Sequence, residues 1–243
     1  TMNPGPAAAD ALGSSDCEEL GTGWLVQPIN ALSSFSFVAV GTVVVAAMFF
    51  RPVDRVRTSV YGACVAAIGV GSVMFHGPQP VGSQLAHDLP ILVTAWFVVI
   101  QDARIVTDRV QRDLRWFAIG TVIATLAAVI EIGTVPPLTA AAVAAILVLE
   151  IVIARRGRRP RPRISGRWVA MAVGGVAALA AAAWILGRTD SPLCDPDDVL
   201  QLHGVWHVLS SVVFGLWWWL AVWLPAGPDA IEDEPVPARA TDR

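Results

Sequence analysis

Seven long stretches of mostly apolar residues, separated by short polar segments, follow one another along the chain. Each is close to the roughly 20 residues that a helix needs to cross the hydrocarbon core of a bilayer. They lie at 29–50, 58–76, 84–102, 115–133, 136–154, 167–187 and 200–224. The pattern predicts an all-α integral membrane protein with a bundle of seven transmembrane helices. Pro90 falls inside the third stretch, where a kink is expected but not a break.

Arginines in alternate loops predict the orientation of these helices. The loops at 51–57, 103–115 and 155–167 carry most of the arginines, whereas the arm at 1–28 carries only acidic charges. By the positive-inside rule, the N-terminus lies outside and the C-terminus inside, as an odd number of spans requires. We therefore expect an extracytoplasmic acidic arm (1–28), a seven-helix domain (29–224) and a disordered, acidic cytoplasmic tail (225–243).

Composition supports a membrane protein and narrows the function classes. Hydrophobic residues make up 55% of the chain and charged residues only 15%, against about 25% in a soluble domain. All 17 basic residues are arginine, so a retinal protein is excluded, because its Schiff base needs a lysine. Abundant Ala and Arg without Lys suggest a GC-rich bacterium and its plasma membrane. In such a protein, arginine-rich loops are explained by their role in setting the orientation of the helices in the membrane. We therefore do not read them as a nucleic-acid-binding patch, and expect no nucleic-acid partner.

Titratable side chains inside spans are costly and usually mark a working site. His76 ends the second stretch, His87 and Asp88 begin the third, and His203 and His207 begin the last. The predicted orientation brings all of them to the outer end of the bundle, at a similar depth. His203 and His207 are four residues apart and share a helix face, a spacing used by zinc ligands on helices. We expect His76, His203 and His207 to form a zinc site with an open position for water.

Two further side chains suggest catalytic roles beside this metal. Ser72 precedes His76 by four residues, so its hydroxyl faces the same side of the helix. Asp88 is a carboxylate within a span, where few structural roles suit it. The structural alternatives are a packing serine, an aspartate paired with an arginine, and histidines that hydrogen-bond between helices.

The cysteines are consistent with the same orientation. Cys17 and Cys194 both fall on the predicted outer side, where an oxidising environment permits a disulfide. Two unrelated thiols are the alternative. Residues 1–28 show no basic start followed by an apolar run, so we expect the first span itself to direct insertion.

Several of these motifs together resemble the alkaline ceramidases, members of a superfamily of seven-helix membrane hydrolases that includes the adiponectin receptors. The resemblance runs from about residue 16 to residue 215. It is carried by Asp16-Cys17-Glu18-Glu19, Asn30-Ala-Leu-Ser33, Gly71-Ser72-Val-Met-Phe75-His76, Gln84-Leu-Ala-His-Asp88-Leu-Pro90 and His203-Gly-Val-Trp206-His207. The combination of Ser-x3-His, a following Asp and a late His-x3-His is specific, whereas each part alone is weak.

The resemblance implies zinc on His76, His203 and His207, oxyanion stabilisation by Ser72 and proton transfer by Asp88. It implies a membrane lipid substrate, ceramide or a related N-acyl lipid, cleaved to a fatty acid and a sphingoid base or other amine. It also implies a disulfide between Cys17 and Cys194, and a calcium site in the arm through Asp16, Glu18 and Glu19.

Two departures from the family pattern affect these assignments. An alignment without gaps places His87 at the position of the family's catalytic aspartate, and Asp88 one position later. We take Asp88 as the catalytic residue and leave His87 ambiguous. In the arm, Leu20 and Gln27 stand where calcium ligands would be expected, and fewer charged oxygens weaken a calcium site.

The sequence therefore predicts a zinc-dependent intramembrane amidase whose active site faces the outer side. Zinc would activate water, Asp88 would move its proton, and Ser72 would stabilise the oxyanion. The alternatives are a receptor-like lipid-binding protein with a structural metal and an esterase or phospholipase acting on another lipid. A membrane haem protein with axial histidine ligands is a further alternative, and a transporter is a weaker one.

Overall fold

All seven apolar stretches form helices, with ends a few residues from those predicted. The computed structural model describes residues 11–50, 53–107, 113–157 and 166–223, with only the backbone at 166–170. The predicted tail at 225–243 and most of the arginine-rich loop at 155–167 lie outside the described residues. The elements are α2 (Pro28–Ser33), α3 (Phe35–Ala46), η1 (Ala47–Phe49), α4 (Arg55–His76), α5 (Ser83–Thr107), α6 (Asp113–Ile130), η2 (Ile132–Thr134), α7 (Val135–Arg156), α8 (Gly166–Leu186), α9 (Leu202–Trp218) and η3 (Trp219–Trp223).

Six helical segments in the described part are long and apolar enough to cross a membrane. They are Pro28–Phe49, Arg55–His76, Ser83–Thr107, Asp113–Ile130, Ile132–Arg156 and Leu202–Val222. The described apolar part of α8, Met171–Leu186, is shorter. The chain is thus an all-helical protein with six candidate spans, and its apolar helices indicate a membrane protein. A seventh span and the sides on which the two ends lie stay predictions.

Local sequence signals explain where several helices begin and end. Asp54 precedes α4 and accepts a hydrogen bond from the Arg57 amide at 3.0 Å, as an N-capping residue does. Pro136, in the first turn of α7, needs no hydrogen-bond partner for its nitrogen. The same helix ends at Gly157, whose φ of 61° is the left-handed conformation that glycine adopts easily.

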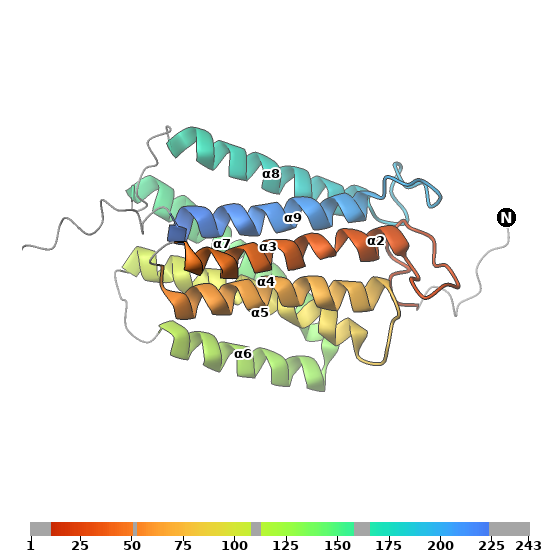
Figure 1. Cartoon of the computed structure of the whole chain (residues 1–243), viewed down its shortest axis with the longest axis horizontal. Helices are drawn as coiled ribbons and strands as arrows, with labels where there is room; N and C mark the ends of the chain where they lie inside the picture. Colours follow the sequence, from red (N-terminus) through yellow and green to blue (C-terminus); the bar gives the residue numbers. More distant parts are fainter. Residues whose placement is uncertain (1–10, 51–52, 108–112, 158–165, 224–243) are drawn as a thin grey trace, which may run out of the picture.

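The helices lie side by side along a common direction (Figure 1). The main packed pairs are α3 with α4, α4 with α5, α5 with α7, and α8 with α9. Glycines bring α3 and α4 close together, because a Cβ on Gly41 would lie 2.5 Å from the Gly62 carbonyl oxygen. Small residues at such crossings are typical of helices packed in membranes. On the outside of the bundle, α7 exposes Val143, Leu147 and Val148, as a lipid-facing helix would.

One end of the bundle gathers the polar side chains that the sequence singles out. In Figure 1 the C-terminal end of α4, the start of α5, the start of α9 and the segment preceding α2 lie together at this end. At the opposite end Arg57 pairs with Asp54 and donates two hydrogen bonds to Asp113, at 2.7 and 2.8 Å. A bidentate contact of this kind ties α4 to α6. We call the end with the four histidines the histidine end of the bundle.

Candidate metal centre

Four histidines from three helices meet at the histidine end of the bundle. His76 is the last residue of α4, His87 lies in the second turn of α5, and His203 and His207 lie in the first turns of α9. The ring centroids of His76, His203 and His207 lie 4.7–5.2 Å from one another. His87 lies slightly further out, with its ring centroid 5.7 Å from that of His76. The predicted convergence of His76, His203 and His207 is confirmed at the level of their rings.

Individual ligand atoms form two overlapping sets that share His76. In one set, atoms of His76, His87 and His207 lie within 4.8 Å of one another; in the other, atoms of Asp16, His76 and His203 do so. Each set contains two of the three predicted zinc ligands and one more side chain. The centre therefore has two candidate ligands beyond the three predicted ones, namely His87 and Asp16.

The orientation of the His76 ring is fixed by Gln27, which precedes α2. The Gln27 side-chain nitrogen donates hydrogen bonds to the carbonyl oxygens of Gly13 at 3.0 Å and Glu18 at 2.8 Å. Its oxygen therefore faces His76, and lies 2.7 Å from Nδ1. Because an amide oxygen only accepts hydrogen bonds, Nδ1 of His76 carries the hydrogen and Nε2 keeps a lone pair.

Ser33 imposes the same tautomer on His207. The Ser33 hydroxyl donates its single hydrogen to the Asn30 carbonyl oxygen at 3.0 Å. It can then only accept a hydrogen bond from Nδ1 of His207, which lies 2.9 Å from it. Nε2 of His207 is again left with its lone pair.

Asp16, in the arm, lies close to His203. One carboxylate oxygen of Asp16 lies 3.2 Å from Nδ1 of His203 and 3.3 Å from Nη1 of Arg188, and the other lies 4.0 Å from Nδ1 of His76. Burial raises the pKa of Asp16 to about 6, although the positive charge of Arg188 opposes the increase. The Asp16 carboxylate thus lies at ion-pair distance from Nδ1 of His203, and neither nitrogen of His203 has a hydrogen-bond partner.

The free nitrogens on the other side of these rings suit a metal ion. Nε2 of His76, His87, His203 and His207 are all buried and have no hydrogen-bond partner. Metal-binding histidines commonly donate one N–H to a carboxylate or carbonyl oxygen and bind through the other nitrogen. Buried polar atoms without a partner are costly, and neutral imidazoles are the form that binds a metal. The donor set therefore fits a divalent ion such as zinc.

The predicted catalytic side chains lie close to this set in the sequence and in the fold. Ser72 is buried one turn before His76 on α4, and its hydroxyl has no hydrogen-bond partner. Asp88 is partly exposed, and its Oδ1 lies 2.6 Å from Nδ1 of His87. The catalytic roles of Ser72 and Asp88 stay predictions.

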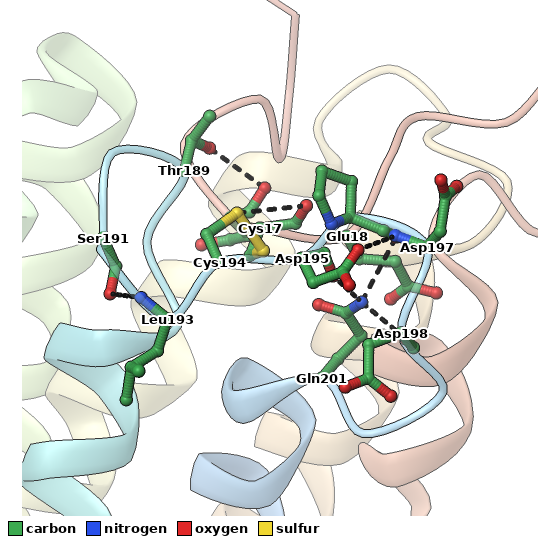
Figure 2. The surroundings of a disulfide bond; sticks show 12 residues. Cys17, Glu18, Thr189, Ser191, Leu193, Cys194, Asp195, Asp197, Asp198 and Gln201 are labelled. Carbon is green, nitrogen blue, oxygen red and sulfur yellow. Dashed lines mark hydrogen bonds between the residues drawn. A yellow bond between two sulfur atoms is a disulfide. The ribbon is translucent and has the colours of Figure 1, made fainter.

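A disulfide holds the arm beside the centre. Cys17 is bonded to Cys194, in the loop between α8 and α9, as Figure 2 shows. The pairing that the resemblance implies is thus confirmed in the structure. The loop is itself braced by Gln201, whose side-chain nitrogen donates to the carbonyl oxygens of Asp195 and Asp198 at 3.1 and 2.7 Å. The bridge fixes Asp16, the preceding residue, next to His203.

The three acidic residues proposed for calcium point in different directions. Asp16 faces the histidines, Glu19 is exposed, and Glu18 accepts hydrogen bonds from the amides of Ile29 and Asn30 at 2.7 and 2.8 Å. Glu18 thus binds the free amides at the start of α2, where a negative charge is favourable. Burial raises the pKa of Glu18, and these two hydrogen bonds oppose the increase. Calcium binding by the arm stays a prediction.

Sequence reasoning missed the residues that support the histidines. Gln27, Ser33 and Asp16 all lie before or within the first span, far from the histidines in the sequence. Ser33 and Asp16 belong to segments that carry the family resemblance, and this resemblance is the only sequence feature that could have pointed to them. Their contacts with the rings depend on the folded arrangement and follow from no spacing rule.

Comparison with known sequences identifies the family of the chain. None of the curated protein sequences matches the chain. The sequence model of the family described as Ceramidase matches residues 22–235, a region that includes α2 to α9 and all four histidines. The match covers most of the chain, and the chain therefore belongs to the ceramidase family.

Proposed function

We propose that the protein is a zinc-dependent amidase that hydrolyses ceramide or a related N-acyl lipid to a fatty acid and an amine. Membership of the ceramidase family supports a hydrolase acting on the amide bond of ceramide. The observation that carries the proposal is the set of buried Nε2 atoms of His76, His203 and His207, each without a partner. In His76 and His207, Nδ1 is also hydrogen-bonded to a side-chain oxygen. This is the arrangement expected of zinc ligands.

The proposed chemistry divides among a few residues. His76, His203 and His207 would hold zinc, which supplies Lewis acidity and lowers the pKa of water towards neutrality. The unpartnered hydroxyl of buried Ser72 would donate a hydrogen bond to the oxygen of the substrate carbonyl as negative charge develops there. On α5, the hydrogen-bonded pair of Asp88 and His87 would supply the basic group of the site.

The position of the centre suits a lipid substrate. The ligands lie in terminal turns of candidate spans, so an amide bond near the lipid headgroups would reach the centre from the bilayer. A lipid could then approach sideways between helices. On the predicted orientation, the site faces the outer side of a bacterial plasma membrane.

Replacing His207 with Ala tests the proposal directly. We expect His207→Ala to lose both bound zinc and hydrolysis of a fluorescent short-chain ceramide, because one ligand and its support from Ser33 are gone. Val208→Ala, at the exposed neighbouring position on α9, is the matched control and should keep both. Metal content measured by mass spectrometry and product release would be compared in the same preparations. Full turnover by a metal-free His207→Ala protein would contradict the proposal.

A screen of lipids would distinguish amide hydrolysis from its alternatives. Wild-type protein would be incubated with N-acyl lipids and matched O-acyl lipids, and the products identified by mass spectrometry. We expect release of fatty acid and free amine from the N-acyl lipids. Cleavage of the esters alone would indicate an esterase or phospholipase, and zinc binding without any cleavage would indicate a receptor-like protein.

A further inference from the structure

His87 and Asp88, consecutive residues near the start of α5, form a hydrogen-bonded pair. Nδ1 of His87 lies 2.6 Å from Oδ1 of Asp88. An ionised carboxylate can only accept, so Nδ1 carries the hydrogen and Nε2 keeps the lone pair. Nε2 is buried and has no hydrogen-bond partner. The carboxylate and the basic nitrogen therefore lie on opposite edges of one imidazole ring.

The free edge of this ring belongs to the metal centre. A ligand atom of His87 lies within 4.8 Å of ligand atoms of both His76 and His207, while its Nδ1 is occupied by Asp88. The ring stacks on Phe75, with centroids 4.5 Å apart and planes inclined by 29°. The stacking and the hydrogen bond to Asp88 together fix the position of the ring.

The backbone around His87 also allows α4 and α5 to pack closely together. A Cβ on Gly71 of α4 would collide with the carbonyl group of Ala86 and would lie 3.0 Å from the amide nitrogen of His87. Pro90 follows four residues after Ala86 and has no N–H to give to that carbonyl. Glycine on α4 and proline on α5 thus allow the two helices to meet where His87 enters the site.

We propose that His87, and not Asp88, exchanges the proton with the reacting groups, and that Asp88 is a positioning residue acting through Nδ1. The proposal rests on the hydrolase function proposed above. As the oxygen of water adds to the amide carbon, one water proton moves to Nε2 of His87. The same proton then passes to the amide nitrogen as the C–N bond breaks. The products are a carboxylic acid and an amine, and the imidazole ends neutral.

The alternative role for His87 is a fourth metal ligand, which would close the open position. One observation favours the proton carrier. The His87 side chain is 12% exposed and that of Asp88 is 22% exposed, against at most 5% for the other three histidines. His87 is therefore the most exposed of the four histidines, as suits the one that meets the substrate.

The experiment compares His87→Gln, His87→Ala and Asp88→Asn with wild-type protein and with Gln84→Ala, an exposed position one turn earlier on α5. Zinc content is measured by mass spectrometry, and kcat and KM are measured with a fluorescent short-chain ceramide in micelles. We expect all variants to keep about one zinc ion per chain. His87→Gln should lower kcat by about 10²–10⁴-fold and leave KM within about threefold. Asp88→Asn should lower kcat by about 10–100-fold, because the ring loses its fixed tautomer.

Added imidazole distinguishes a proton carrier from a structural role. It should restore part of the activity of His87→Ala, whose cavity can admit it, and leave Asp88→Asn unchanged. The proposal is overturned if His87→Gln is as active as wild type, or if the His87 variants lose zinc and so identify a ligand. It is also overturned if Asp88→Asn is the more damaging change and imidazole does not rescue His87→Ala. Wild-type protein that cleaves no N-acyl lipid would instead remove the underlying hydrolase function.

Discussion

Polar side chains from the arm and from α2 and α5 lie against the histidines of the centre. Gln27, Ser33, Asp16 and Asp88 each present an oxygen to Nδ1 of one histidine. For Gln27 and Ser33 the direction of the hydrogen bond is decided by their own backbone contacts. The tautomers of His76 and His207 are therefore set by the fold before any ion binds, which is the preorganisation that a functional site needs.

Gln27→Met removes this control from His76 and keeps a similar side-chain volume. We expect the affinity for zinc to fall by about 10–100-fold, because Nδ1 loses its acceptor and the ring can rotate or adopt the other tautomer. Competition with a fluorescent zinc chelator would measure the change. Gln84→Met, exposed on α5, is the matched control and should bind zinc like the wild-type protein. Equal affinities for the two variants would show that Gln27 does not support the ligand.

At the scale of helices, hydrophobic runs and histidine spacing were enough to predict the seven helices and the meeting of His76, His203 and His207. A run of apolar residues has to form a helix in a membrane, so its length nearly determines the element. The contacts of Gln27 and Asp16 could not be predicted, because they depend on how the arm folds back over the bundle. The role of His87 was ambiguous for a related reason: one residue along a helix turns a side chain by about 100°.

Gly71 is the position at which helix packing controls the centre most directly. Gly71→Ala places a Cβ against the backbone at Ala86 and His87, so α4 and α5 have to separate. We expect the free energy of unfolding to fall by about 1–3 kcal/mol. Ceramide hydrolysis should fall too, since His87 is displaced.

Thermal unfolding in detergent and the hydrolysis assay would check both effects. Gly174→Ala on α8 is the matched control, because a Cβ there meets nothing within 4 Å. That change should leave the midpoint of unfolding unchanged or raise it, since alanine favours a helix. A Gly71→Ala protein as stable and active as Gly174→Ala would contradict the assigned close contact.

At the scale of the whole molecule, the number of spans decides on which sides of the membrane the ends lie. Six candidate spans are evident in the described residues, and α8 is the helix that would make seven. Reporter cysteines placed at residues 5 and 240 of a protein with the three native cysteines replaced would be labelled with an impermeant maleimide in intact cells. We expect labelling at the N-terminal reporter only, because seven spans put the ends on opposite sides. Labelling of both reporters, or of neither, would indicate an even number.

The bond between Cys17 and Cys194 also constrains the order in which the protein can be made. Its two cysteines are 177 positions apart, and His203 and His207 follow the second one. A nascent chain emerging from the ribosome thus carries its arm long before the partner cysteine and the last two histidines exist. Insertion intermediates therefore lack both the completed histidine centre and the disulfide that holds the arm beside it.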